Sequence, residues 1–407
     1  MKDYEASQIN PSYVEEEPAN SAEAPSTDWD NLVQTDQPLA STQPLAPNQA
    51  PDSWQPSTLA SEQLTNFEQE SRKFFSGNAI FSDIDGTITD NSGQISASAI
   101  AAIKDFTAQG GQFIPVTGRA RFESVQSIVE ALDLPLVVIN DGAEIFNRQG
   151  ERIFGSELTD HEVQTAFDLA DKYQLTWMQN KHNPATNEEY LYSNFTEESE
   201  QAMLAVGIVD TVHNEESRIG LSAKAATAEE VMSISGQNYK IQMMSPDPQA
   251  IKAAHQELCE RGIPCILNMQ SPQTGEYHWV EVIRGTKTSG IQTVIDEFLP
   301  ENVDTVVTMG DGGNDIPMLT AQFHNRAGDL VPNRSIAVGN ASEKVKAVTS
   351  RTLRSDYDKI RGTLSDDRRF GVASEIVIRA LKINLLRRAK AKSLNYQADA
   401  VSTKTVA

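Results

Sequence analysis

The sequence predicts an α/β fold, a doubly wound parallel sheet that is interrupted by an inserted α+β module and preceded by a disordered N-terminal tail. Short apolar strands alternate with amphipathic helices from residue 79 onward, which is the pattern of parallel sheets with crossover helices. Polar and glycine residues gather directly after these strands, where open parallel sheets bind their ligands. The middle of the chain, at about 160–270, has helices and strands without the acidic or glycine-rich motifs of the rest, and residues 1–66 show no apolar pattern.

Residues 1–66 form the predicted tail, because they are acidic and rich in Pro, Ser and Gln. Eight of the eighteen prolines come before position 57. Such a segment buries too little apolar surface to offset the entropy that it would lose on ordering. Trp29 and Trp54 are either docking points for a partner or, as we favour, incidental aromatic residues in a solvating tail.

The first part of the core, residues 67–158, begins with the apolar strand Ala79–Ser82, which runs straight into Asp83. Gly110 and Gly111 stop the next helix, and apolar residues return after each helix. The further elements expected in this part are helices Ala97–Gln109 and Phe122–Leu132 and strands Gln112–Val116 and Leu136–Ile139.

An α+β module is expected at residues 159–272, inserted into the core. Its expected elements are helices Glu162–Tyr173 and Ala250–Arg261 and strands Tyr239–Met244 and Cys265–Met269. The parallel pattern is expected to resume in the second part of the core, residues 273–362. The elements predicted there are strands Trp279–Ile283, Thr305–Met309 and Ser335–Val338 and helix Ser289–Phe298.

Residues 363–407 are expected to form a basic helix followed by a frayed tail. Val372, Ile376 and Leu385 belong to an apolar stripe that Arg and Lys residues flank. A basic amphipathic helix can lie on an anionic membrane or bind a protein partner. We favour the alternative that it is a terminal helix packed on the core.

Composition excludes several classes of function. The formal net charge of −23 argues against nucleic acid as the main partner, because a polyanion needs a basic face. The two cysteines, Cys259 and Cys265, are too few for a disulfide framework. With no pair of histidines nearby they predict two half-buried thiols rather than a zinc site. The start of the chain has no signal-peptide pattern and no apolar run is long enough for a membrane span, so a cytoplasmic protein is expected.

Two acidic loops directly follow apolar strands, at Asp83-Ile84-Asp85-Gly86-Thr87 and at Gly310-Asp311-Gly312-Gly313-Asn314-Asp315. Carboxylates at the ends of parallel strands converge above the sheet, and a cluster of such hard oxygens suits Mg²⁺. The glycines allow the backbone to approach closely and leave amides free for phosphate oxygens. An EF-hand calcium loop is excluded, because Thr87 and Gln94 stand where that loop requires acidic residues.

Four motifs together resemble those of the haloacid dehalogenase (HAD) superfamily. They are DIDGT at 83–87, VTGR at 116–119, a downstream lysine at 287 and GDGGND at 310–315. The resemblance covers about residues 79–350 and extends to the Cof-like subgroup, in which a large α/β cap lies between the second and third motifs. It implies a Rossmann-like core, a cap formed by the inserted module, and a Mg²⁺-dependent phosphatase that forms an aspartyl-phosphate.

By this resemblance Asp83 is the nucleophile, and Asp85 protonates the leaving oxygen and then activates water. Thr117 is expected to donate a hydrogen bond to a phosphoryl oxygen, and Lys287 to offset negative charge. The expected Mg²⁺ ligands are Asp83, the backbone carbonyl of Asp85 and Asp311, and Asp315 is expected either to bind the ion directly or to support its ligands. The residues expected to contact the substrate are Gly86, Thr87, Gly118, Arg119, Asn140 and Asn314.

Three of these positions leave alternatives open. Arg119 either grips a second anionic group of the substrate or forms a structural salt bridge. Asn140 begins a turn that departs from the subgroup's usual Asn-Gly-Ala, because Asp141 is inserted. In the cap, polar aromatic residues either contact the leaving group or pack within the cap, which we favour; they are Trp177, His182, Tyr190, Tyr192 and Trp279.

The expected substrate is a small phosphate monoester, such as a sugar phosphate or a similar metabolite. A phosphomutase is the alternative within the superfamily, since some relatives keep both aspartates of DIDGT. A binding or regulatory protein without catalysis is the alternative of a different class, with the two tails as its working parts.

Overall fold

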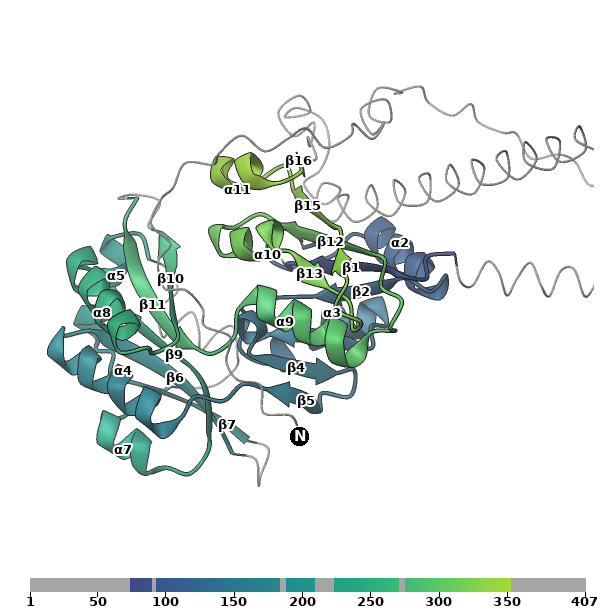
Figure 1. The fold of residues 1–407 in the computed structure, drawn as a ribbon. Coiled ribbons are helices and arrows are strands. Elements are labelled where there is room, and N and C mark those ends of the chain that lie inside the picture. The colour runs from purple at the N-terminus through teal and green to yellow at the C-terminus, as the bar shows by residue number, and fades with distance from the viewer. Residues whose placement is uncertain (1–73, 90–92, 184–187, 209–222, 271–274, 353–407) are drawn as a thin grey trace, which may run out of the picture. The chain divides into compact units, whose positions relative to one another are not determined.

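The computed structural model describes residues 74–89, 93–183, 188–208, 223–270 and 275–352 (Figure 1). The tail that carries Trp29 and Trp54 and the basic C-terminal helix were predicted for residues that lie outside these ranges. Among the helices of the described ranges, none is both long and apolar enough to cross a membrane.

The core is built on a five-stranded parallel sheet in the order β16-β15-β12-β1-β2 (Figure 1). All residues of β1 (Asn78–Ser82) are buried, as an apolar strand covered on both faces requires. β12 (Thr305–Gly310) and β2 (Gln112–Pro115) pair with it on its two sides. β15 (Asn333–Ala337) and β16 (Arg351–Thr352) complete the sheet.

Helices cover both faces of this sheet. Ile80 of β1 lies in an apolar cluster with residues of α2 (Ala97–Ala108) and α3 (Glu123–Leu132). Phe81, the next residue, lies in a second cluster, because successive strand side chains point to opposite faces. The helices of that second cluster are α9 (Lys287–Thr293) with its π-helical continuation Val294–Phe298, α10 (Ile316–Thr320) and α11 (Glu343–Val348). The predicted α/β fold class is confirmed.

A small antiparallel sheet extends the core. β3 (Leu136–Ile139) lies beside β2 through one parallel bridge and then pairs with β4 (Glu144–Asn147), which pairs with β5 (Arg152–Gly155). The sequence pattern predicted β3 but not the hairpin of β4 and β5. A second short hairpin joins β13 (Phe323–His324) and β14 (Leu330–Val331).

The inserted module, hereafter the cap, contains a six-stranded sheet in the order β10-β11-β9-β6-β7-β8. Its pairs are antiparallel except for β7 with β8. The strands are β6 (Thr176–Asn183), β7 (Glu188–Ser193), β8 (Lys224–Ala225), β9 (Gln237–Met244), β10 (Cys265–Gln270) and β11 (Tyr277–Ile283).

Strand β11 corrects the predicted organisation. The sequence pattern placed Trp279–Ile283 in the core, in the part assigned to residues 273–362. β11 instead pairs with β10 and β9 in the cap sheet, so the core resumes only after Ile283. An apolar strand has the same pattern in a parallel and an antiparallel sheet, so its sequence alone did not distinguish the two.

The cap sheet has two different faces. One face packs in an apolar cluster that includes Ile241 and Met243 of β9, and the helices over it are α4 (Asp160–Lys172), α7 (Ala228–Ser233) and α8 (Pro248–Glu260). On the other face Met244 packs with Trp279 and with α5 (Glu197–Ala205). By alternation Lys240 and Gln242 lie on the same face as Met244, and both are buried.

Candidate active site

The two acidic loops leave the sheet side by side. β1 and β12 are parallel neighbours in register, with Ser82 opposite Met309, so the residues that follow them emerge at the same edge. The backbone N–H of Asp83 donates to the carbonyl of Met309 at 2.9 Å, which continues the ladder past the strand end. The predicted convergence of the two loops is therefore observed, and parallel pairing is its cause.

Asp83 is buried beside Lys287. The Lys287 Nζ donates to Asp83 Oδ1 at 2.6 Å, and the side chain of Asp83 is 8% exposed. Burial raises the pKa of Asp83 well above its usual value, and the nearby carboxylates of Asp315 and Asp311 raise it further against the lowering effect of Lys287. A carboxylate in this position has been removed from water and is held against a single cation.

Lys287 also binds Asp315, with Nζ to Oδ1 at 2.6 Å, and its side chain is only 1% exposed. Although burial favours the neutral amine, the carboxylates of Asp315 and Asp83 raise the pKa of Lys287, so it stays charged. The lysine is the first residue of α9, whose first turn is capped by Thr286. Its backbone is therefore fixed by the start of a helix.

Helix α9 is held against the turn after β3 by contact between backbones. Gly142 has a φ of +96°, and a Cβ there would collide with the carbonyl oxygen of Thr286. A Cβ at Gly290 would lie 2.7 Å from the Cα of Gly142. Because no side chain separates the two segments, the position of Lys287 follows directly from the position of this turn.

Asp315 orders the second acidic loop. Its Oδ2 accepts hydrogen bonds from the backbone N–H groups of Asp311 and Gly312, both at 3.0 Å, while its Oδ1 accepts from Lys287. Both oxygens of Asp315 are thus engaged by strong donors. This geometry makes Asp315 an anchor for the loop and the lysine, and leaves it a weaker candidate than Asp311 for direct metal binding.

Asp311 is held more loosely. Its Oδ1 accepts from Thr87 Oγ1 and its Oδ2 from Asn340 Nδ2, each at 3.3 Å. Thr87 Oγ1 is also 3.3 Å from Asp83 Oδ2, so the threonine spans the two carboxylates. Burial, reinforced by the charge of Asp315, raises the pKa of Asp311 to about 6.

The residues at this point fit Mg²⁺. One carboxylate oxygen from each of Asp83, Asp311 and Asp315 lies within 4.8 Å of the others. The potential ligand atoms are all hard oxygens. Asp83 Oδ2 and both carboxylate oxygens of Asp311 make only long hydrogen bonds, which a cation can replace. Two buried carboxylates and the half-buried one of Asp311, close to a single lysine, also leave an excess of negative charge that a divalent ion would offset.

Gly86 and Asn340 shape the same corner. Gly86 has a φ of +75°, and a Cβ there would lie 2.5 Å from Asp311 Oδ2, so only glycine fits. Asn340 Nδ2 donates to the carbonyl of Gly86 at 2.8 Å and thereby joins the two acidic loops. Sequence reasoning missed Asn340, because a lone asparagine after the strand Asn333–Ala337 carried no motif.

Asp85 and Arg119 are bound to each other. Arg119 Nε donates to Asp85 Oδ2 at 2.9 Å and Arg119 Nη2 to Asp85 Oδ1 at 2.6 Å, and the side chain of Asp85 is 55% exposed. Arg119 also donates to the carbonyl of Ser124. Of the two alternatives for Arg119, the salt bridge is the one that this structure contains. The exposed Asp85 carboxylate lies outside the group formed by Asp83, Asp311 and Asp315.

Thr117 and Gly118 lie at the end of β2, next to Asp83. Val116 N–H donates to the carbonyl of Ser82 at 2.8 Å, which sets Thr117 beside Asp83. Thr117 is 1% exposed, and its Oγ1 accepts from the N–H of Arg119 at 3.2 Å. Its hydroxyl hydrogen therefore remains available to an acceptor above the sheet. Asn314, by contrast, is exposed on the rim of the second loop.

Asn140 and the inserted Asp141 both adopt left-handed backbone conformations, with φ of +53° and +49°. Asn140 Nδ2 donates to Glu144 Oε2 at 2.9 Å, while its Oδ1 is buried without a hydrogen bond. Asp141 is 3% exposed, and its Oδ2 lies 3.6 Å from Nζ of the cap residue Lys240. Asp141, the residue inserted into this turn, therefore forms an ion pair with Lys240 of the cap.

Lys240 was not anticipated from the sequence. Its Nζ donates to the carbonyl of Gly118 at 3.1 Å and lies 3.3 Å from Glu281 Oε1. Gln242 Nε2 donates to the same glutamate oxygen at 3.2 Å. This buried polar group on β9 and β11 brings a lysine, a glutamate and an amide from the cap to the loop that carries Thr117 and Gly118.

The polar aromatic residues proposed for the cap are mostly packed. Trp177 and Tyr192 belong to the apolar cluster under α4, α7 and α8, and Tyr190 packs against that cluster. Trp279 belongs to the cluster on the other face of the cap sheet, and His182 is 9% exposed. The favoured interpretation, packing within the cap, agrees with these contacts for the aromatic rings.

Comparison with known proteins agrees with this geometry. The family model of haloacid dehalogenase-like hydrolases matches residues 80–359. A curated relative, the 5-amino-6-(5-phospho-D-ribitylamino)uracil phosphatase of Bacillus subtilis (strain 168), is 25% identical over 288 residues, which cover 67% of this chain and 92% of that protein.

Solved structures share the fold. A haloacid dehalogenase-like hydrolase from Bacteroides thetaiotaomicron has a TM-score of 0.51 and 18% identity, covering 74% of this chain and 99% of that one. Another from B. subtilis has a TM-score of 0.51 and 17% identity, covering 67% and 93%. Since the family model spans more than half of the sequence, the chain belongs to the haloacid dehalogenase-like hydrolases, as its four motifs predicted.

Proposed function

We propose that this protein is a Mg²⁺-dependent phosphatase that hydrolyses a small phosphate monoester through an aspartyl-phosphate on Asp83. The observation that carries the proposal is the buried Asp83 carboxylate, held at 2.6 Å by Lys287 and facing the loosely bonded Asp311. A carboxylate is a weak nucleophile, so it needs a phosphoryl group whose charge is offset and whose position is fixed. The lysine and the metal-binding carboxylates supply these two conditions.

In the first step the Asp83 carboxylate attacks phosphorus, and the bond to the leaving oxygen breaks. Lys287 stabilises the charge on the phosphoryl oxygens, and Thr117 donates its hydroxyl hydrogen to one of them. Asp83 and Asp311 would hold Mg²⁺, which would supply further charge neutralisation when bound. In the second step water attacks phosphorus, releases inorganic phosphate and restores Asp83.

Asp85 is the proposed acid in the first step and base in the second. To reach the leaving oxygen its carboxylate must exchange the bond to Arg119 for one to the substrate. Exposure of 55% leaves room for that rotation. An anionic or hydroxyl-rich leaving group that binds Arg119 would release Asp85 from the salt bridge. Substrate binding would thereby bring the Asp85 carboxyl group to the leaving oxygen.

The polar group of Lys240, Gln242 and Glu281 is the proposed recognition site for the leaving group. A lysine, an amide and a carboxylate offer both donors and acceptors, as hydroxyl groups of a polyol or sugar require. The B. subtilis relative is named for a phosphorylated ribityl compound, which is of this chemical kind. A sugar phosphate or polyol phosphate is therefore the proposed substrate class.

The test is phosphate release from a panel of sugar phosphates, polyol phosphates, nucleotides and p-nitrophenyl phosphate, with Mg²⁺ and with EDTA. Asp83→Asn is expected to abolish release while the variant melts like the wild type. Asp171→Asn, at an exposed position next to the end of α4, is the matched control and should leave turnover unchanged. Residual turnover by Asp83→Asn above about one hundredth of wild type would exclude Asp83 as the nucleophile.

The phosphomutase alternative is tested in the same assay. A mutase moves the phosphoryl group between two hydroxyls and releases little inorganic phosphate, so sugar phosphates would change isomer while free phosphate stays low. Inactivity of the wild-type protein on every compound, in hydrolysis and in transfer, would favour the binding-protein alternative.

A further inference from the structure

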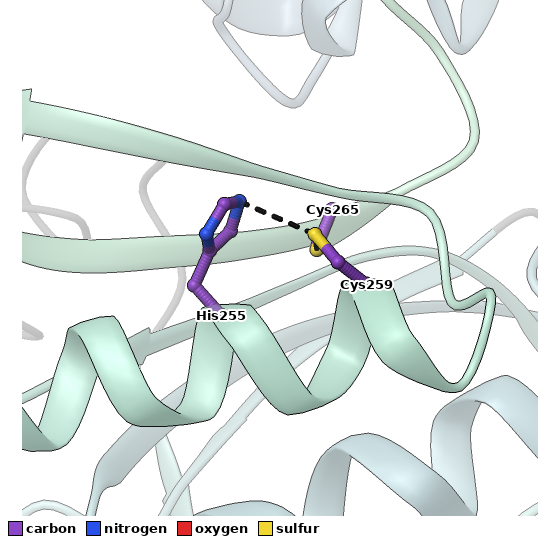
Figure 2. A group of neighbouring side chains, drawn as sticks. All are labelled: His255, Cys259 and Cys265. Atoms are coloured by element: carbon purple, nitrogen blue, oxygen red, sulfur yellow. Dashed lines mark hydrogen bonds between the residues drawn. The ribbon is translucent and has the colours of Figure 1, made fainter. Parts of the chain in front are cut away.

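Three side chains that catalysis does not use lie together in the cap (Figure 2). Cys259 Sγ is 3.6 Å from His255 Nε2 and 3.7 Å from Cys265 Sγ, and both cysteines are free. All three potential ligand atoms lie within 4.8 Å of one another. Each of these residues is partly exposed, so solvent and ions reach the cluster.

The backbone around the cluster brings the three residues together in a defined way. His255 and Cys259 are four residues apart on α8 and so share one face of the helix. The helix ends in a Schellman turn, in which Gly262 has a φ of +70°, its N–H donates to Cys259 O and the N–H of Ile263 donates to Leu258 O.

The turn reverses the chain, and Cys265 follows it as the first residue of β10. There it pairs with Val282 of β11, and the N–H of Ile283 donates to Pro264 O at 3.0 Å. Both cysteines are thus attached to regular elements whose ends are hydrogen-bonded. Their sulfur atoms face each other as Figure 2 shows, with the imidazole of His255 on the same side.

The separations of Cys259 Sγ from the other two ligand atoms match two edges of a tetrahedral metal site. With Zn–S bonds of about 2.3 Å and Zn–N bonds of about 2.0 Å, a tetrahedron has S···S edges of about 3.8 Å and S···N edges of about 3.5 Å. The observed separations, 3.7 and 3.6 Å, are close to these edges. The two sulfur atoms are not bonded to each other, because a disulfide requires an S–S distance of about 2.05 Å.

We propose that His255, Cys259 and Cys265 form a binding site for a thiophilic divalent metal ion, with Zn²⁺ as the fitting ion and water as the fourth ligand. Two thiolates and one imidazole are the donors that select zinc over magnesium. This site is separate from the oxygen-ligand site of Asp83 and Asp311. It joins the end of α8 to the edge strand of the cap sheet.

The protonation states of the free cluster set how binding depends on pH. Burial lowers the pKa of His255, so its imidazole is neutral and ready to bind at pH 7. Burial, with the neighbouring Cys259, raises the pKa of Cys265, so its thiol is protonated before metal arrives. Zn²⁺ displaces the thiol protons and forms two Zn–S bonds, so binding releases up to two protons and weakens as pH falls.

The two half-buried thiols expected from the sequence agree with the free, partly exposed cysteines of the structure, and the proposed metal site goes beyond that expectation. Two cysteines without a pair of histidines predicted unligated thiols. One histidine is enough here, because His255 stands one helical turn before Cys259. The spacing of the three residues was visible in the sequence, but the turn that brings Cys265 back onto the helix was not.

The experiment is titration of the reduced, full-length protein with Co²⁺ under anaerobic conditions, followed by displacement with Zn²⁺. Tetrahedral thiolate ligation gives a charge-transfer band in the near ultraviolet and intense visible bands, which oxygen ligands do not give. We expect one equivalent of Co²⁺ to produce both and one equivalent of Zn²⁺ to remove both. Zn²⁺ at one hundred times its Kd should raise the melting temperature by about 4 °C.

Variants assign the signal to residues. Cys259→Ser, Cys265→Ser and His255→Asn should each weaken Co²⁺ binding at least about tenfold and remove the Zn²⁺-dependent rise in melting temperature. His161→Asn, at an exposed histidine of α4, is the matched control and should bind like the wild type. Asp83→Asn should also keep the charge-transfer band, because that band does not involve the carboxylates.

Three outcomes would overturn the proposal. The first is a Co²⁺ spectrum without a charge-transfer band, and the second is equal metal affinity in wild type and Cys265→Ser. The third is recovery of a Cys259–Cys265 disulfide by mass spectrometry after incubation with Zn²⁺ in air, where O₂ is the oxidant, which would make the pair a redox couple instead. Because each variant is compared with itself with and without metal, a loss of intrinsic stability does not change the measured difference.

Discussion

Removing the cation from the buried carboxylates is the most direct perturbation of the site. In Lys287→Met the side chain keeps its length and apolar stem but loses the charge that lies 2.6 Å from both Asp83 Oδ1 and Asp315 Oδ1. The lysine is 1% exposed and its partners 8% and 1%, so water does not replace it. Breaking a buried pair in this way costs about 3–5 kcal/mol.

For a folded unit of this size such a cost lowers the melting temperature by about 5–10 °C. The assay is thermal unfolding followed by circular dichroism, in EDTA and then in Mg²⁺. Mg²⁺ should recover part of the loss, because it brings positive charge to the same carboxylates. Turnover should fall by about 10² to 10³, since the charge on the phosphoryl oxygens loses one of its stabilising groups.

Lys172→Met is the matched control. Lys172 Nζ lies 2.5 Å from Glu257 Oε2, a distance similar to those of the Lys287 ion pairs. The side chain of Lys172 is 54% exposed, however, so this ion pair lies in water rather than in the interior. Its loss should lower the melting temperature much less than Lys287→Met does and should leave turnover unchanged, with no response to Mg²⁺. If Lys287→Met melted within about 2 °C of the wild type, or if both variants lost equal stability, the role assigned to burial would be wrong.

Three further changes test other contacts. Gly142→Ala should destabilise the protein by at least about 3 kcal/mol in chemical unfolding, because the added Cβ would collide with the Thr286 carbonyl. Gly328→Ala is the control: it has a φ of +88° but open space around it, and should cost about 1 kcal/mol. Equal losses in the two variants would contradict the backbone contact. Hydrogen bonds from Lys172, Tyr173 and Arg261 lower the pKa of Glu257 to about 2. The ionised Glu257 therefore stabilises the folded protein at pH values above the ordinary pKa of a glutamate, and this stabilisation is lost as the pH falls towards 2. Glu257→Gln should therefore melt below the wild type at pH 7 and match it near pH 2; a constant difference would refute this. Asp311→Asn should abolish the rise in melting temperature that Mg²⁺ gives the wild type, and retention of that rise would exclude Asp311 as a ligand.

The sequence was sufficient for the features that follow from strand ends. Apolar strands 79–82 and 305–309 lead directly into carboxylates, and parallel pairing then brings Asp83 and Asp311 together. Helix α2 begins at Ala97 as expected, because Ser96 caps it through the N–H of Ala99. The roles of these site residues in catalysis remain predictions.

Other features depended on packing that has no local pattern. β6 carries Gln179 and Lys181 as buried residues within an antiparallel sheet, so it lacks the apolar alternation of a strand and was not predicted. Lys240 stands without any motif inside the predicted strand Tyr239–Met244, and it is buried because Gly118, Asp141 and Glu281 provide partners. Such residues are identified only when distant segments are placed together.

The contact between the backbones of Gly142 and Thr286 also bears on how this sequence can vary. Where a buried lysine is positioned through layers of side chains, substitutions in those layers can compensate one another. Here the first residue of α9 rests on a turn without an intervening side chain, so no neighbouring substitution can restore a lost glycine. Randomised libraries of this protein should therefore accept changes throughout the apolar clusters of the core and almost none at Gly142 or Gly290.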